Sequence, residues 1–202
     1  MTDSGRADFE VVLMRHGQTE WSVSGQHTGN SDIPLTAEGE VEALAMAPHI
    51  SDHSYDLVLS SPLKRALDTC KLVGLGEHVQ VREDLREWDY GEYEGLTSAQ
   101  IRVDAPDWFL WRDGCPGGES PAEIVERCAR VVDELVAHRD AGGGDAIVFA
   151  HGHILRALAT VWCDLPLTAG ANLILSTAAA SSLSFEHKTP AIKFWNRTSQ
   201  DP

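Results

Sequence analysis

The sequence contains no run of about 18 consecutive apolar residues, so it predicts no helix that crosses a membrane. Residues 1–8 are polar and lack the apolar core of a signal peptide, which favours a cytoplasmic location. No internal repeat and no low-complexity linker interrupts the chain. The 202 residues therefore suit a single α/β domain over residues 1–202.

The sequence also has few cysteines and few basic residues. The four cysteines have no Cys-x-x-Cys spacing, which indicates reduced thiols used mostly in packing. The chain has 31 acidic and only 16 basic residues, for a formal net charge of -15. This balance argues against nucleic acid or an anionic membrane as a partner, because both require a basic face. A site for an anion must therefore be built from a few local cations.

The first informative feature is an apolar run that begins at residue 11 and ends in Arg15, His16 and Gly17. Such runs are typical of buried strands in parallel sheets, and ligands of open α/β sheets bind beyond the carboxyl ends of the strands. A cation and an imidazole placed there predict a site for an anion and a nucleophile. Gly17 allows a sharp turn and a close approach to a ligand. Arg-His-Gly alone does not exclude a strand that simply ends in polar residues.

Two further strands are expected to end at the same edge. Residues 56–60 precede Ser61-Pro62, an N-cap and first-turn proline for a helix that carries Arg65. The helix dipole disfavours a cation there, so Arg65 is better explained by an anion bound at that helix end. Residues 146–150 form another apolar run, which ends in His151-Gly152-His153 and repeats the opening pattern.

A candidate proton donor lies among the acids and aromatic rings of residues 85–95. An acid flanked by rings is partly desolvated, which favours its protonated form and suits a general acid. The residue pattern alone leaves four acids open: Glu87, Asp89, Glu92 and Glu94. Residues 88–120 predict an irregular cap, in which the aromatic run at 108–111 fits core packing and a pocket wall equally well.

Periodicity predicts further helices and a closing edge of the sheet. One helix is expected after an N-cap at Thr36, with an end or kink near Pro48. Its inward face would consist of Ala37, Val41, Leu44 and Ala45. A long amphipathic helix is expected after a capping box at Ser120, and another over residues 154–165. The closing strands, as an antiparallel edge, are expected at residues 173–177, 182–186 and 192–195.

The polar loop at residues 22–32 and two histidines complete the candidates. The backbone amides of this loop suit an anion. His27 lies within it and is assigned a minor role at most, because loop histidines are commonly solvated. His151 and His153 have the spacing of a metal-binding pair, but no carboxylate or cysteine stands nearby at ligand spacing. We therefore expect no metal.

In their order along the chain, these motifs resemble the histidine phosphatase superfamily, in the branch also called phosphoglycerate-mutase-like. They are Arg-His-Gly after the first strand, Ser-Pro-Leu-Lys-Arg at a helix start, Leu-x-Glu with Gly four residues on, and His-Gly after a late strand. The resemblance covers residues 9 to about 165. It implies a three-layer α/β/α fold with a mostly parallel central sheet and a phosphohistidine mechanism with no metal or cofactor. A homodimer is a further expectation from the family.

The resemblance also implies roles for individual residues. His16 would be the nucleophile and Glu87 the proton donor. The other catalytic residues would be Arg15, Arg65 and His151, which grip the phosphoryl group. The substrate-binding set would be Arg15, Ser22, Thr28, Gly29, Arg65, His151 and Gly152. Ser22 stands where many members have Asn, so one phosphate contact departs from the family pattern.

Segments at 17–22, 27–29, 86–95 and 111–115 are similar to small bacterial acid phosphatases and to the sedoheptulose-bisphosphatase group. We therefore expect a phosphomonoesterase that acts on small phosphorylated metabolites. The alternatives are a cofactor-dependent phosphoglycerate mutase and a catalytically silent phosphate-binding protein.

A mutase needs cations for a second anionic end of its intermediate, and these are few. Residues 88–150 contain no lysine and five arginines. Only Arg102 and Arg112 are expected to be placed for such a contact. The other three lie on the long helix and are expected to be mostly solvated: Arg127, Arg130 and Arg139.

Overall fold

A computed structural model describes residues 9–51 and 53–201, and in these residues six strands form one mixed sheet. The strand order is β3-β2-β4-β1-β5-β6. Neighbouring strands among β1 to β4 are parallel, whereas β5 and β6 add an antiparallel edge beside β1. The strands are β1 (Val11–Arg15), β2 (Leu57–Ser60), β3 (Gln80–Val81), β4 (Ala146–Ala150), β5 (Ala180–Glu186) and β6 (Thr189–Arg197).

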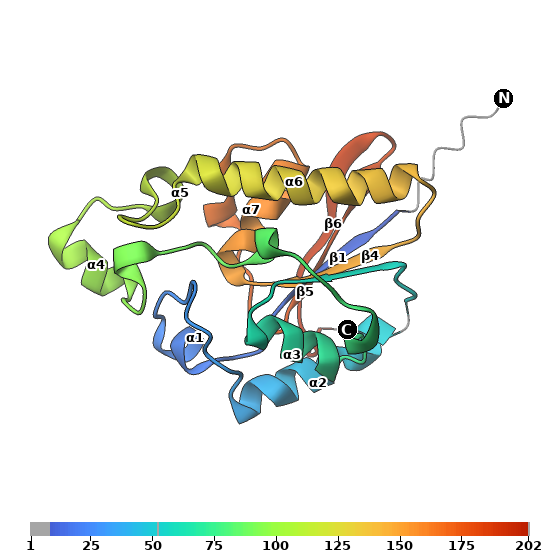
Figure 1. Cartoon of the computed structure of the whole chain (residues 1–202), viewed down its shortest axis with the longest axis horizontal. Helices are drawn as coiled ribbons and strands as arrows, with labels where there is room; N and C mark the ends of the chain where they lie inside the picture. The colour runs from blue at the N-terminus through green and yellow to red at the C-terminus, as the bar shows by residue number, and fades with distance from the viewer. Residues whose placement is uncertain (1–8, 52, 202) are drawn as a thin grey trace.

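Helices cover both faces of the sheet, with α6 and α7 on one face and α2 and α3 on the other (Figure 1). The α-helices are α1 (Glu20–Ser24), α2 (Ala37–Ser51), α3 (Lys64–Leu72), α4 (Ser98–Asp104), α5 (Leu110–Asp113), α6 (Pro121–Asp140) and α7 (Gly152–Trp162). Single turns of 3-10 helix are η1 (Gly76–His78), η2 (Glu83–Leu85), η3 (Gly91–Tyr93) and η4 (Leu167–Asn172).

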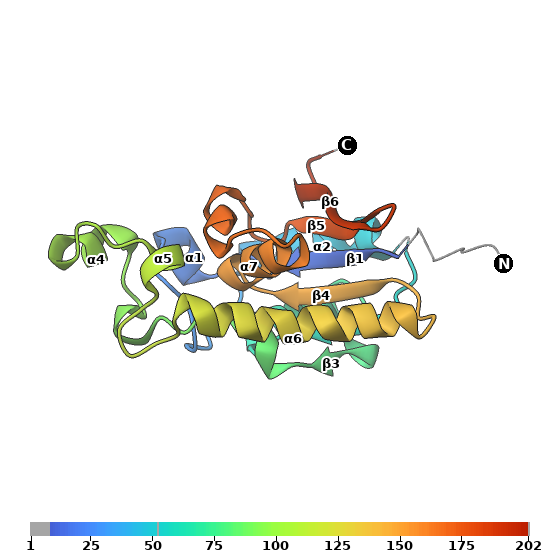
Figure 2. The same cartoon turned by 90° about the horizontal axis from the view of Figure 1, so that it is seen from above.

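Alternate residues of β1 pack into opposite layers, because successive side chains of a strand point to opposite faces. Val11 and Leu13 belong to the hydrophobic cluster that includes residues of α6 and α7. Val12 and Met14 belong to a second cluster, which includes Met46 of α2. The central strands are therefore buried on both sides, and the predicted three-layer α/β/α fold is confirmed (Figure 1). Figure 2 looks onto the sheet from the side of α6 and shows β4 and β1 next to each other, with β3 toward one edge and β6 toward the other.

The register of the parallel strands brings the predicted motifs to one edge of the sheet. Arg15 pairs with Ala150, and Ser60 pairs with Phe149. The residues that follow β1, β2 and β4 therefore emerge side by side. Helices α1, α4 and α5 lie at this end of the molecule, at the left of Figure 1.

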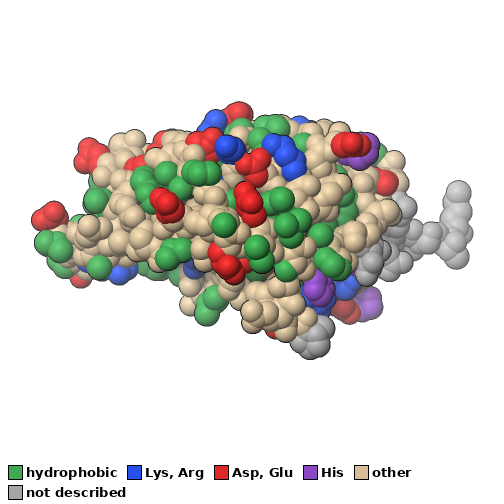
Figure 3. Space-filling model, turned by 90° about the horizontal axis from the view of Figure 1, so that it is seen from below, with side chains coloured by type: hydrophobic (Ala, Val, Ile, Leu, Met, Phe, Trp, Pro, Cys, Tyr) green, Lys and Arg blue, Asp and Glu red, His purple; other side chains and the backbone are tan. Residues whose placement is uncertain are grey.

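The buried face of α2 differs from the prediction. Val41 and Leu44 are 57% and 51% exposed. The buried residues are Gly39, Ala43, Met46 and Ile50. Gly39 allows this orientation, because a Cβ at this position would lie 2.1 Å from the carbonyl oxygen of Gln18. Apolar periodicity does not detect such a backbone contact. On the face of the molecule that carries α2, hydrophobic side chains lie interspersed with acidic ones (Figure 3).

Helix α2 contains Pro48 and ends at Ser51, close to the predicted end. Two other predicted boundaries are wrong. Helix α3 begins at Lys64, because Ser61 Oγ accepts the N–H of Leu63 in a turn before the helix. Residues 173–177 are not a strand, since this segment leaves η4 as a loop beside the end of β1. The capping box at Ser120 and the length of α6 agree with the sequence pattern.

The segment over residues 97–118 is more regular than expected, since it contains α4 and α5. Trp108 and Trp111 are at most 8% exposed and belong to the main hydrophobic cluster, so core packing describes these rings.

All four cysteines are free, and three are buried, as expected for packing thiols. In the described ranges, no helix combines the length and the hydropathy needed to cross a bilayer.

Candidate active site

His16 follows β1 and presents one free ring nitrogen. Its Nδ1 lies 2.7 Å from the carbonyl oxygen of Gly17, which only accepts, so Nδ1 carries the proton and Nε2 has a lone pair. Nε2 has no hydrogen-bond partner among the described residues, yet it is not among their buried unpartnered atoms, which are Arg15 Nε and Tyr55 Oη. It is therefore accessible. Burial and then the charge of Arg15 lower the pKa of His16 well below its usual value, which keeps the ring neutral.

Arg15, the last residue of β1, keeps an unused donor beside His16. Its Nη1 donates to the carbonyl oxygen of Leu175 over 2.5 Å. Its Nε is buried and has no partner in the part of the chain that the structure describes. Gly152 lies against this guanidinium, since a Cβ there would meet the guanidinium carbon at an ordinary contact distance of 3.4 Å. A buried N–H without a partner costs about 1–3 kcal/mol, and an anion would satisfy it.

Arg65 and His151 meet next to His16. Arg65 Nε donates to His151 Nδ1 over 3.0 Å, so the proton of this neutral imidazole lies on Nε2. That nitrogen is 2.7 Å from Ser61 Oγ. Arg65 and His151 are fully buried, and the ring centroids of His16 and His151 are 5.2 Å apart. Burial and then the charge of Arg65 lower the pKa of His151 well below its usual value.

The loop after α1 is held between Arg65 and Glu94. The guanidinium of Arg65 donates to the carbonyl oxygens of Thr28, Gly29 and Ser31 over 2.8–3.1 Å. The carboxylate of Glu94 accepts the backbone N–H groups of Gly29 and Ser31. The amide of Gly29 is thus used within the protein.

Glu87 is held at the N-terminus of α7. Its Oε1 accepts the backbone N–H groups of Trp88 and Ile154 over 3.0 and 2.8 Å, and its Oε2 accepts that of His153 over 2.9 Å. These three bonds fix the position of the carboxylate at the start of α7. Arg127 donates to the carbonyl oxygen of Glu87 and so positions its backbone.

Arg15, His16 and Glu87 line a pocket of about 190 Å³ at the carboxyl edge of the sheet. The sequence-predicted residues in its wall are Arg15, His16, Ser22, Thr28, Glu87 and Gly152. Three others lie outside the wall: Gly29, Arg65 and His151. Asp89, Glu92 and Glu94 are also absent from the wall, which favours Glu87 among the four acids. Ser22 bonds to Thr19 in the capping box of α1, so its hydroxyl is already engaged.

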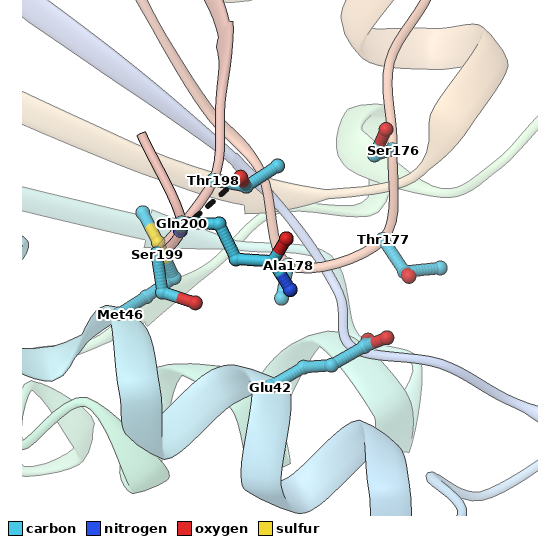
Figure 4. A pocket seen from close by; sticks show the side chains of 8 residues that line it. All are labelled: Glu42, Met46, Ser176, Thr177, Ala178, Thr198, Ser199 and Gln200. Carbon is cyan, nitrogen blue, oxygen red and sulfur yellow. Dashed lines mark hydrogen bonds between the residues drawn. The ribbon is translucent and has the colours of Figure 1, made fainter. Parts of the chain in front are cut away.

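A second pocket, of about 200 Å³, lies beyond the segment that carries Leu175 (Figure 4). The neighbouring residues Ser176, Thr177 and Ala178 belong to its wall, with Glu42 facing them from α2. Among the described residues of its wall, only Glu42 carries a charged side chain. This second pocket therefore does not suit a phosphate group, whereas the pocket at His16 does.

The wall residues that the sequence analysis missed or undervalued include His27, Tyr90, His153 and Arg156. Arg156 stacks on Trp111 at 4.8 Å and donates to Gly170. Arg156 was missed because only the arginines of residues 88–150 were considered for a second anion. Its position four residues after Gly152 in α7 was a usable signal, since both then lie on one face of the helix.

The structure also corrects the expectations for other side chains. His27 is not a solvated loop residue: its ring lies 4.6 Å from that of Tyr90, and burial lowers its pKa to about 4. Arg127 is only 8% exposed and pairs with Glu119, although it was expected to be solvated. Arg102 and Arg112 do not belong to the pocket wall.

Within residues 9–51 and 53–201, no three His, Cys, Asp or Glu residues are grouped so as to hold a metal ion. The His-x-His pair does not converge on one point. His151 bonds to Arg65 and Ser61, whereas His153 bonds to Tyr90.

Comparisons with known proteins agree with this arrangement. The sequence model of the histidine phosphatase superfamily (branch 1) matches residues 11–198. An acid phosphatase of Mycobacterium tuberculosis is 40% identical over 185 residues, which cover 91% of this chain and 90% of that protein. A sedoheptulose 1,7-bisphosphatase of Saccharomyces cerevisiae is 37% identical over 183 residues, which cover 76% of this chain and 67% of that protein.

A 2,3-bisphosphoglycerate-dependent phosphoglycerate mutase of Cytophaga hutchinsonii is 32% identical over 73% of this chain and 74% of that protein. Among solved structures, an open reading frame product of Mycobacterium tuberculosis superimposes with a TM-score of 0.90 at 38% identity. The superposition covers 96% of this chain and 100% of the solved chain.

Proposed function

The chain belongs to the histidine phosphatase superfamily and is a phosphoric monoester hydrolase, and we propose that it works through a phosphohistidine on His16. The observation that carries this proposal is the pairing of two unused groups. The Nε2 lone pair of His16 is accessible in the pocket, and the adjacent Arg15 has a buried N–H without a partner. A phosphate monoester supplies an electrophile for the first and an acceptor for the second.

In the first step, His16 Nε2 attacks phosphorus and the bond to the leaving oxygen breaks. Charge then spreads over the three equatorial oxygens, so catalysis depends on positioning and electrostatics. Arg15 binds these oxygens directly. Arg65 and His151 act from outside the pocket wall. The guanidinium of Arg65 adds positive charge near the phosphoryl group, and it bonds to His151, whose ring packs against that of His16.

Glu87 is the proposed proton donor to the leaving oxygen. Its Oε2 has one backbone donor and Oε1 has two, so Oε2 is the better site for the proton. In the second step, the Glu87 carboxylate takes a proton from water, whose oxygen attacks phosphorus and breaks the bond to His16. No metal is needed in this scheme.

The substrate-binding set follows from the same pocket. Thr28 and Gly152 lie in its wall and are proposed to contact the phosphate. Ser22 lies in the same wall, and a contact of Ser22 with the phosphate would have to replace one of its hydrogen bonds to Thr19. Gly29 contributes indirectly, since its carbonyl oxygen holds Arg65. The proposed substrate is a small phosphorylated metabolite. The homodimer and the cytoplasmic location stay predictions.

Hydrolysis is favoured over mutase activity because the pocket offers few cations for a second phosphate. Arg15 serves the reacting phosphate, and Arg156 is the other cation in the wall. The test supplies 3-phosphoglycerate with catalytic 2,3-bisphosphoglycerate and follows 2-phosphoglycerate and free phosphate together. We expect phosphate to form faster, and a much faster appearance of 2-phosphoglycerate would establish the mutase alternative.

A further inference from the structure

Tyr90 and His153 form a short hydrogen bond in the wall of the pocket. Tyr90 Oη lies 2.6 Å from His153 Nδ1, and Tyr90 is only 1% exposed. Burial raises the pKa of Tyr90 well above its usual value, so the phenol keeps its proton. Tyr90 Oη has no other partner in the described part of the chain. Its proton therefore points at the Nδ1 lone pair of His153.

This bond selects one tautomer of His153. A neutral imidazole that accepts at Nδ1 carries its proton on Nε2. Burial, and then the charges of Arg156, His27 and Arg15, lower the pKa of His153 well below its usual value, so the ring is neutral. Like His16 Nε2, His153 Nε2 lacks a partner in residues 9–51 and 53–201 and is not among the buried atoms there. The side chain is 23% exposed and lines the pocket. His153 thus presents a free N–H donor.

We propose that His153 is a specificity-determining residue, whose Nε2–H donates a hydrogen bond to an oxygen of the leaving group, and that Tyr90 is the positioning residue that fixes its tautomer. The proposal rests on the phosphatase function proposed above. It names a substrate class, namely phosphate esters whose leaving group carries a hydroxyl or ether oxygen near the reacting phosphate. Trp21 and His27 lie in the same wall, where their rings are available to pack against its carbon skeleton.

The neighbouring carboxylate explains why Tyr90 is needed. Glu87 Oε2 lies 3.9 Å from His153 Nδ1. Without Tyr90, this carboxylate favours the tautomer with the proton on Nδ1, which would leave a lone pair on Nε2 facing the pocket. Tyr90 therefore keeps His153 as a donor toward substrate beside a competing acceptor.

Tyr90 and His153 would make the same contacts with each other if they served only in packing. The test therefore compares substrates that differ in the leaving group. The double variant Tyr90→Phe/His153→Phe removes both hydrogen-bonding partners together, which avoids leaving one of them buried and unpaired. Glycerol 3-phosphate and n-propyl phosphate share a three-carbon chain and similarly poor leaving groups, and they differ in hydroxyl groups. Both need Glu87, so an effect transmitted through Glu87 lowers both rates equally.

In the double variant, kcat/KM for glycerol 3-phosphate is expected to fall about tenfold relative to n-propyl phosphate, the size of one hydrogen bond. His153→Gln, which restores an N–H donor, is expected to recover most of the preference, and Tyr90→Phe alone to lose part of it. Equal losses on both esters, or a wild-type enzyme without preference for glycerol 3-phosphate, overturn the proposal and leave the phosphatase function intact. A wild-type enzyme that releases phosphate from neither ester, nor from phenyl phosphate, overturns the proposed function itself.

Discussion

Glu87 Oε1 accepts a hydrogen bond from the backbone N–H of Ile154 over 2.8 Å, although the two residues lie far apart in the sequence. This bond joins the proposed proton donor to the helix that follows His151. The helix also supplies the N–H of His153 to the other carboxylate oxygen. Strand β4 and α7 therefore set the relative positions of the acid and the second histidine.

Glu87→Gln is expected to slow hydrolysis of alkyl phosphates about 10²- to 10⁴-fold and that of nitrophenyl phosphate much less, because a nitrophenolate leaves without protonation. The amide nitrogen of Gln would also face a backbone donor, which costs about 1–3 kcal/mol of stability. Steady-state rates on both ester types, with urea unfolding alongside, separate the two effects. Equal rate losses on both esters would assign the proton donor to another group.

The observed orientation of α2 makes a second prediction. Met46→Ala is expected to lower the free energy of unfolding by about 2–5 kcal/mol, because Met46 is 1% exposed in the hydrophobic cluster under β1. Leu44→Ala, on the exposed face of the same helix, is the matched control and is expected to change it by less than about 0.5 kcal/mol. Chemical denaturation measures both. The reverse order would support the face predicted from periodicity.

The sheet and its motifs were predictable because buried parallel strands leave a continuous apolar signal. β1 and β4 both show it, and their endings in Arg15-His16 and His151 marked one edge of the sheet. The face of α2 was not predictable, because Gly39 orients the helix by a backbone contact with Gln18 that apolar periodicity does not register. The loop at residues 173–177 has the composition of a strand, but the carbonyl oxygen of Leu175 accepts a hydrogen bond from Arg15 instead of pairing with a strand.

The candidate site was predictable where a motif follows a strand and unpredictable where distant segments meet. Arg65 and Glu87 were both found by their place in the motif series. The tautomers of His16 and His151 depend on partners that only folding brings into contact, such as Arg65. Tyr90 likewise meets His153 from a loop 63 positions away.

Acid should weaken the fold through His27. Its pKa is about 4 in the folded protein and about 6.5 when unfolded, so between these values the unfolded chain binds more protons. The free energy of unfolding should therefore fall as the pH drops from 6.5 toward 4. His27→Gln is expected to reduce this slope, whereas His78→Gln, at an exposed position, should not. Urea titrations at several pH values measure it, and identical slopes in all three proteins would contradict the burial of His27.

Chelation is expected to leave turnover unchanged. Arg15 and Arg65 already provide the positive charge that two-metal phosphatases take from ions. The measurement is phosphate release before and after treatment with EDTA, followed by addition of Mg²⁺, Mn²⁺ or Zn²⁺. Activity that is lost on chelation and restored by one of these ions would count against the arginine-based site.

The most direct test of the account is to identify the phosphorylated residue. Enzyme mixed rapidly with ³²P-labelled ester and quenched without acid is digested and mapped, with His16→Ala as the control. We predict acid-labile, base-stable label on His16 that forms and decays at rates compatible with turnover, and no label in the variant. Label on a serine or an aspartate, or full turnover by His16→Ala, would contradict the mechanism.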